Sequence, residues 1–77
     1  MKDVHITSPY ITLGQLLKHV GVIGTGGEAK YFLQDHLVDV NGVLEQRRGR
    51  KIVPGDVVKC MQETYQVLNE VRWSPIT

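Results

Sequence analysis

The segment Val38-Asp39-Val40-Asn41-Gly42-Val43-Leu44-Glu45 carries the clearest structural signal in the chain. Asn-Gly between residues that favour β-structure is the strongest short signal for a hairpin, because both residues tolerate the positive φ of a type I′ turn. We therefore expect antiparallel strands over residues 38–40 and 43–45. A small antiparallel sheet forms the centre of the predicted fold.

Segments on either side of the hairpin add strands to this sheet. A turn at Pro54-Gly55-Asp56 is followed by apolar, β-branched residues that predict a second antiparallel pair. That pair would cover residues 57–61 and 65–68. Alternating apolar and polar residues over 3–7 predict a further short strand. Val71 and Trp73 are expected to cap the core.

A first helix is predicted ahead of the hairpin by a capping box, in which Thr12 and Gln15 each accept the other's free backbone N–H. An apolar stripe with helical spacing follows at Leu13, Leu16, Leu17 and Val20. Gly21 can end this helix, because glycine adopts a positive φ without strain. Residues 12–21 therefore predict one short amphipathic helix.

A second helix is predicted by another capping box, formed by Thr25 and Glu28. Its buried stripe would be Ala29, Phe32, Leu33 and Leu37. Two short helices bury little surface against each other, so both must pack on the sheet. The predicted fold class is α+β, with two short helices packed on a small, mostly antiparallel β-sheet.

The composition limits the classes of function. A chain of 77 residues is expected to form one domain over 1–77, too small for a multi-domain enzyme. Its net charge of +1 excludes a broadly basic protein. Cys60 is the single cysteine, which excludes an internal disulfide and a cysteine zinc site, and it is predicted to be a core residue. Without a membrane-length apolar run or a signal-peptide pattern, we expect a cytoplasmic protein with no membrane partner.

A cluster of cations directly follows the hairpin. Arg47-Arg48-Gly49-Arg50-Lys51 carries four cations in five residues. Cations packed this closely repel one another, and phosphate oxygens would offset that cost, because the guanidinium fork matches their geometry. The alternative interpretation is a solvated loop. Its place beside a stiff hairpin favours a phosphate-binding role.

Several motifs together resemble one known family. Leu13, Leu16 and Leu17, then 25–30, 38–42 and 54–58, are similar in order and spacing to the S-four RNA-binding domain. The Gly-Gly-Glu-Ala-Lys and Arg-Arg-Gly-Arg-Lys segments look most like its small stand-alone bacterial members, often called YaaA-like. The resemblance covers about residues 10–60. It implies a helical pair on a small sheet (the alpha-L motif) that binds structured RNA, such as ribosomal or transfer RNA, without catalysis.

The resemblance also implies a contact surface, at the start of helix two and after the hairpin. Its residues would be Lys18, Thr25, Gly26, Gly27, Lys30, Arg47, Arg48, Arg50 and Lys51. A helix N-terminus attracts phosphate through its free N–H groups and its dipole. No catalytic residue, metal or cofactor is implied, and a monomer is favoured. Many members begin helix one with Arg-Leu-Asp and helix two with Ser-Arg, so two family cations are missing at 12–14 and 25–26.

The sequence is also compatible with other functions. The main alternative is a protein-interaction module that docks the same basic loop on an acidic or ribosome-associated partner. Residues 24–29 also match the dinucleotide pattern Gly-x-Gly-x-x-Ala, with Glu45 about twenty residues on, but the hairpin that follows is the wrong context. The histidines are scattered and suggest no catalytic group. Tyr31 and His36 could stack on an unpaired RNA base, although packing is the commoner role.

Overall fold

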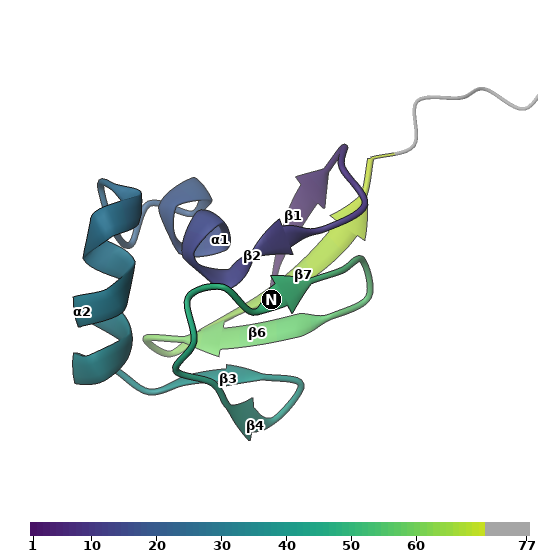
Figure 1. Cartoon of the computed structure of the whole chain (residues 1–77). Coiled ribbons are helices and arrows are strands. Elements are labelled where there is room, and N and C mark those ends of the chain that lie inside the picture. Colours follow the sequence, from purple (N-terminus) through teal and green to yellow (C-terminus); the bar gives the residue numbers. More distant parts are fainter. Residues whose placement is uncertain (71–77) are drawn as a thin grey trace, which may run out of the picture.

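The structure is a computed structural model and describes residues 1–70. The elements run in the order β1 (Lys2–Ile6), β2 (Ile11–Thr12), α1 (Leu13–His19), a 3₁₀ turn (Gly26–Glu28), α2 (Ala29–Asp35), β3 (Val38–Val40), β4 (Val43–Leu44), β5 (Lys51–Ile52), β6 (Val57–Cys60) and β7 (Glu63–Asn69). The two helices lie at one end of the molecule with the strands beside them (Figure 1). The predicted α+β class is confirmed.

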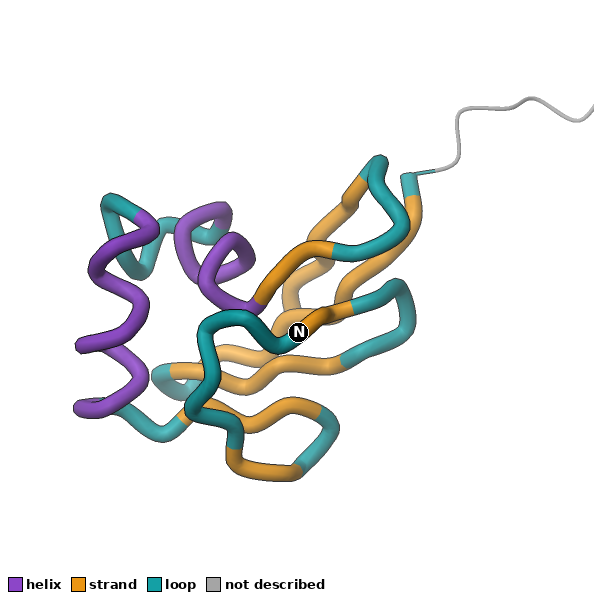
Figure 2. The backbone as a smooth tube through the Cα atoms, viewed as in Figure 1, coloured by secondary structure: helices purple, strands orange, loops and turns teal. Residues whose placement is uncertain are grey.

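The main sheet has five strands in the order β1-β7-β6-β3-β4, and β2 pairs separately with β5 (Figure 2). Every pair is antiparallel except β1 with β7, which run parallel with Val4 opposite Val67. The expected hairpin is confirmed: Asn41 and Gly42 have φ values of 54° and 84° between β3 and β4. β6 ends at Cys60, one residue earlier than predicted, because Met61 and Gln62 take positive φ in the turn to β7.

Helix α1 begins and ends as its sequence predicts. The Thr12 hydroxyl accepts the N–H of Gln15, and the Gln15 side chain accepts the N–H of Thr12. At the other end Gly21 has φ +85°, and its N–H donates to the Lys18 carbonyl while the N–H of Val22 donates to the Leu17 carbonyl. This pair of bonds is a Schellman motif, which satisfies carbonyls that the last turn leaves free.

The second predicted capping box is wrong. Thr25 precedes a 3₁₀ turn over Gly26–Glu28, and its side chain caps no backbone N–H. Its hydroxyl instead donates to a Glu28 carboxylate oxygen at 3.4 Å, and α2 starts only at Ala29. Glycine has little preference for the α-helical conformation, so the two successive glycines do not start the α-helix. The chain forms a tighter 3₁₀ turn at these residues, and the α-helix begins after it.

The core lies between the helices and the sheet. It consists of Val4, Ile6, Leu13, Leu16, Leu17, Ile23, Ala29, Leu33, Val38, Val40, Ile52, Val58, Cys60, Tyr65 and Val67. Cys60 is buried as predicted, and burial raises the pKa of its thiol. The predicted burial of Leu37 is wrong, because α2 ends at Asp35 and leaves that side chain 77% exposed. Val71 and Trp73 lie outside the described residues. No helix within residues 1–70 is long and apolar enough to cross a membrane.

Candidate nucleic-acid interface

The basic segment is fastened to the start of α1. The carbonyl of Arg50 accepts the N–H of Leu13 at 2.8 Å, and the carbonyl of Arg48 accepts the N–H of Gly14 at 2.9 Å. The β2–β5 pair continues this contact, with Thr12 opposite Lys51. The free N–H groups of the first turn of α1 are therefore used inside the protein, by its own loop and its capping threonine.

Gly14 makes this close contact possible. A Cβ at this position would lie 3.3 Å from the Cβ of Ala29 and 3.5 Å from the Arg48 carbonyl oxygen. The first of these contacts is tighter than ordinary side-chain packing, so a larger residue would push the neighbouring segments away from the helix. The close packing of these segments therefore explains why a glycine occupies position 14.

The loop and the start of the second helical segment meet in one surface hollow. Gly26, Arg48 and Gly49 all line it. Its remaining lining comes from Thr12, Gly14 and Gln15 at the start of α1. Two regions more than twenty residues apart in the sequence, which were predicted to act together, are thus neighbours in space.

The predicted contact residues are nearly all at the surface. Eight are exposed and Arg50 is half-buried; the exposed ones are Lys18, Thr25, Gly26, Gly27, Lys30, Arg47, Arg48 and Lys51. Lys18 lies in the last turn of α1, at the opposite end from the hollow. Lys30 is in the first turn of α2, close to Gly26 and Gly27 in the chain. The structure therefore gathers the start of the second helical segment and the loop, with Lys18 as an outlying cation.

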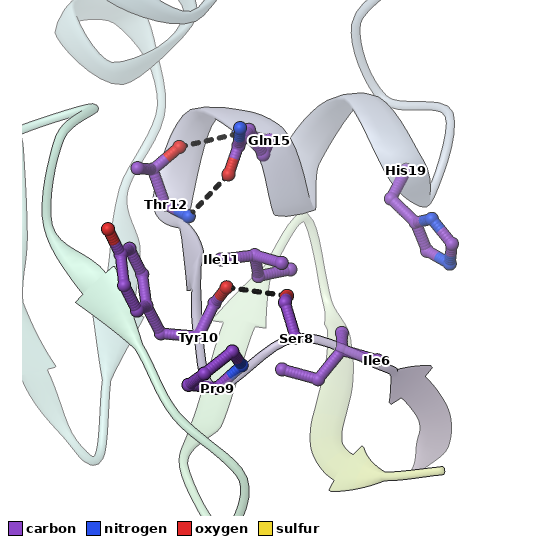
Figure 3. A pocket seen from close by; sticks show the side chains of 8 residues that line it. All are labelled: Ile6, Ser8, Pro9, Tyr10, Ile11, Thr12, Gln15 and His19. Carbon is purple, nitrogen blue, oxygen red and sulfur yellow. Dashed lines mark hydrogen bonds between the residues drawn. The ribbon is translucent and has the colours of Figure 1, made fainter.

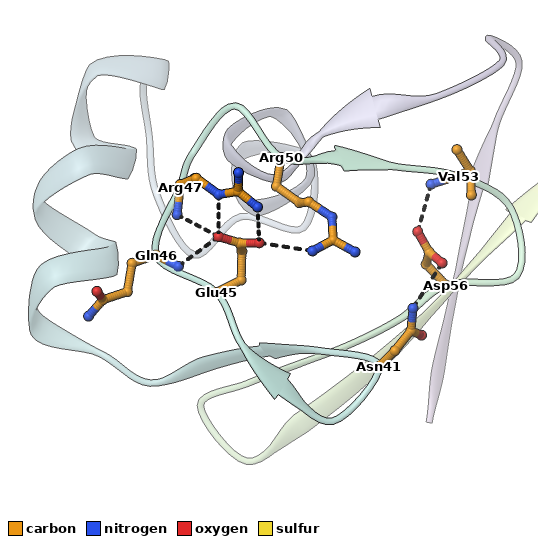
Figure 4. Close-up of polar contacts among 7 residues, drawn as sticks. All are labelled: Asn41, Glu45, Gln46, Arg47, Arg50, Val53 and Asp56. Atoms are coloured by element: carbon orange, nitrogen blue, oxygen red, sulfur yellow. Dashed lines mark hydrogen bonds and ion pairs between the residues drawn. The ribbon is translucent and has the colours of Figure 1, made fainter.

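A carboxylate outside the predicted contact surface organises the basic loop. Glu45 directly follows β4 and is 7% exposed, and the guanidinium groups of Arg47 and Arg50 converge on it (Figure 4). Its two oxygens lie 3.0 Å from Arg47 Nε, 3.2 Å from Arg47 Nη2 and 2.9 Å from Arg50 Nη1. Backbone N–H groups of Gln46 and Arg47 donate to it at 3.1 Å.

These bonds set the protonation of Glu45. Hydrogen bonds from Arg47, first from its side chain and then from its backbone, lower the pKa of Glu45 from 4.5 to about 2, against an opposing effect of burial. The carboxylate is thus charged at neutral pH, and part of the cationic charge of the loop is balanced within the protein. The closeness of Glu45 in sequence to Arg47 and Arg50 could have suggested this ion pairing. The pairing forms because the folded loop turns both arginine side chains back toward Glu45.

A second polar network joins the turn between β3 and β4 to the turn between β5 and β6. Asn41 Nδ2 donates to Asp56 at 3.0 Å (Figure 4). Asn41 Oδ1 accepts the N–H of Val57 at 2.9 Å. The other Asp56 oxygen accepts the N–H of Val53 at 2.9 Å. The hairpin turn is thereby fixed to the turn between β5 and β6, and the predicted turn role of Asp56 is confirmed.

Tyr10 contacts the last residue of the basic segment, Lys51. The ammonium of Lys51 lies 4.9 Å from the centre of the Tyr10 ring, which is a cation–π distance. A second hollow, lined by Ser8, Pro9 and Tyr10 among others, shares Thr12 and Gln15 with the first (Figure 3). No sequence pattern signals this contact, because residues 10 and 51 meet only through the β2–β5 pair.

The two aromatic residues predicted as possible base-stacking groups differ in their surroundings. The His36 ring is stacked on Phe32, with 4.3 Å between the ring centres, and its Nδ1 lies 3.2 Å from the Phe32 carbonyl oxygen. One face of that ring is thus already covered. Tyr31 is 64% exposed. Both residues are exposed, but only the His36 ring is stacked on another ring within residues 1–70.

The dinucleotide interpretation fails on geometry. Residues 22–23 form no strand, the glycines enter a 3₁₀ turn, and an antiparallel hairpin follows α2. Glu45 is occupied by two arginines, so it is not placed to bind a ribose. Within residues 1–70 no group of three or more histidine, cysteine, aspartate or glutamate side chains is arranged to hold a metal ion.

Comparison with known proteins agrees with the fold. Residues 4–68 match the family model described as the S4 domain. A protein from Bacillus subtilis (strain 168), described as a probable ribosome maturation protein RlbA, is 48% identical over 67 residues. That alignment covers 86% of this chain and 94% of the relative. The similarity thus extends over nearly the whole length of both chains.

Proposed function

This chain belongs to the S4-domain family, whose members are generally non-catalytic RNA-binding modules, and we propose that it grips the phosphate backbone of structured RNA in the context of the ribosome. The contacts would come from the start of the second helical segment and from the loop at 47–51. Ribosomal RNA is the first candidate ligand, because the 48% identical relative is described as a ribosome maturation protein. Transfer RNA is the second.

One observation carries this proposal: the hollow that Gly26 lines together with Arg48 and Gly49. A phosphate there would meet glycine backbone with no side chain in the way, beside a guanidinium on an exposed loop. Lys30 and Lys51 would add charge on either side. Such contacts position a protein on RNA but carry little sequence information, so recognition would depend on RNA shape.

An NMR titration of the labelled protein with ribosomal RNA fragments and with transfer RNA, at low and moderate salt, tests the proposal. We expect shifts concentrated at 25–30 and 47–51 that weaken as salt rises. The Arg47→Ala, Arg48→Ala and Arg50→Ala triple variant should lose affinity while its remaining amide signals show a folded protein. Unchanged affinity in the folded triple variant would exclude this loop as the contact surface.

The same experiment separates RNA from a protein partner. If neither RNA shifts any signal even at low salt, the basic loop would instead dock on an acidic or ribosome-associated protein. Unrelated structured RNA should then fail to compete with that partner. If unrelated RNA did displace the protein partner, the RNA and the partner would share one phosphate-binding surface.

A further inference from the structure

We propose that Glu45 is a positioning residue for RNA binding: its carboxylate holds the turn from Arg47 to Arg50 in the shape that presents Arg48 beside Gly26. This inference rests on the proposed function and adds an internal anion that the binding surface needs. It assigns a role opposite to that expected of a negative charge close to a phosphate-binding loop.

The carboxylate is itself held in place. The N–H of Glu45 donates to the Val38 carbonyl at 2.8 Å, so its backbone continues the ladder of β3 and β4 beyond the last strand residue. The side chain is 8% exposed and receives five hydrogen bonds, from Gln46, Arg47 and Arg50. A charge-assisted bond to a fixed, largely buried acceptor constrains its donor more than a bond to a mobile surface group.

Helix α1 also holds the loop, through backbone hydrogen bonds. The carbonyls of Arg48 and Arg50 accept N–H groups of α1, and the N–H of Arg50 donates to the Arg47 carbonyl at 3.2 Å to close the turn. Glu45 therefore holds the side chains of Arg47 and Arg50 and the backbone at 46–47, while α1 holds the backbone carbonyls of Arg48 and Arg50. Removing the carboxylate would release one of these two attachments and leave the other intact.

Arg48 is the residue that this arrangement presents. Arg47 and Arg50 form ion pairs with Glu45, whereas Arg48 forms none among residues 1–70 and is exposed on the wall of the hollow. The neighbouring arginines thus have a structural task in addition to any phosphate contact. Arg48 is left with its guanidinium donors available.

Two physical effects of removing Glu45 have opposite signs, and this makes the proposal testable. Loss of one negative charge raises the net charge from +1 to +2 and by itself should tighten binding to RNA. Loss of the fixed loop means that its long side chains must be ordered on binding, which weakens affinity. We expect the second effect to be larger, with Glu45→Gln binding RNA about threefold to tenfold more weakly than the wild type.

The control is Glu63→Gln, which removes the same charge at a distance from the loop. Glu63 lies at the start of β7 and pairs with Lys2 at 3.7 Å across a largely exposed surface. Affinity for a ribosomal RNA fragment would be measured for both variants at one salt concentration. A double-mutant cycle then adds Arg48→Ala, which should cost less affinity in the Glu45→Gln background than in the wild type.

The outcomes separate the two claims. Glu45→Gln binding as tightly as Glu63→Gln, or more tightly, would overturn the positioning role, as would an unchanged cost of Arg48→Ala. A wild type that binds no RNA would instead overturn the proposed function. A purely structural role would lower thermal stability without changing affinity at temperatures where both proteins are folded.

A measurement on the wild type covers the case in which Glu45→Gln does not fold. Hydrogen exchange at the Arg47 Nε–H and at the amides of Gln46 and Arg47 reports their bonds to Glu45. We expect these protons to exchange slowly and to remain protected when RNA is bound. Protection that is lost on RNA binding would mean that phosphate replaces Glu45, and would contradict the proposal.

Discussion

At the scale of single residues, two polar side chains hold the turns around the surface that is proposed to contact RNA. Glu45 organises the basic loop, and Asn41 joins two turns through Asp56 and Val57. Asn41 bonds to residues that are 15 and 16 positions away in the sequence. Glu45 bonds to Arg50, whose side chain folds back toward it. Replacing either should leave a polar group without its partner, which costs more than the bond itself contributes.

The pKa of Glu45 predicts a pH dependence of stability. Because the folded-state pKa is lowered to about 2 from 4.5, the ionised carboxylate stabilises the folded protein above about pH 4.5, and this contribution disappears as the pH falls toward 2. Glu45→Gln should therefore be less stable than the wild type by about 1–2 kcal/mol at pH 7, because the exposed Arg47 partner is screened by water. Denaturant unfolding at pH 7 and pH 3 should show that this difference shrinks in acid. A difference that stays constant would contradict the ion pairing.

Asn41→Asp tests the second group. The substitution keeps the residue's shape and its tolerance of the φ of 54°, but it places a carboxylate where Asn41 Nδ2 now donates to Asp56 at 3.0 Å. Two carboxylates in contact repel each other, so we expect a loss of about 1–3 kcal/mol at neutral pH. Urea unfolding should show part of that loss recovered below about pH 4. Asn41→Gly, which removes the side chain but suits the turn, is the control.

At the scale of elements, local signals predicted what local bonds determine. Thr12 and Gln15 indicated the start of α1, and Asn41-Gly42 indicated the turn between β3 and β4, since each signal acts within a few residues. Leu37 was placed wrongly because its position continued the helical spacing although the helix had already ended. The parallel pairing of β1 with β7 could not be predicted, because it joins the two ends of the described chain.

The candidate surface divides in the same way. The cations and glycines were visible in the sequence, because charge and backbone freedom are properties of single residues. Their arrangement was not: the contacts of Gly14 with Arg48, of Tyr10 with Lys51 and of Glu45 with Arg50 depend on pairings made only in the folded chain.

The end of α1 gives a prediction for an element as a unit. Gly21 has φ +85°, and no neighbouring atom lies within 4 Å of the place that a Cβ would occupy, so Gly21→Ala tests the backbone conformation alone. We expect it to destabilise the protein by about 1–2 kcal/mol, since the left-handed region is unfavourable for alanine. Gly26→Ala, which also has open space but no positive φ, should change stability little. Thermal unfolding compares them, and equal effects would rule out this explanation.

At the scale of the whole molecule, charge placement rather than net charge should govern RNA affinity. The chain has nine lysines and arginines against eight acidic residues, so no long-range positive field draws it to RNA. Binding would depend on about four or five local phosphate contacts, which predicts a slope of roughly −3 to −4.5 for log K against log salt.

Two double variants with the same net charge decide the point. Arg48→Ala with Lys51→Ala removes two cations from the loop at 47–51, and Lys2→Ala with Lys59→Ala removes two from strands of the main sheet. The first pair should lower affinity for structured RNA strongly and reduce the salt slope by about 1.4 to 1.8, because two phosphate contacts are lost. The second should leave the slope nearly unchanged. Equal losses in both would mean that RNA responds to total charge, and that the surface formed by the loop and the start of the second helical segment has no special part in binding.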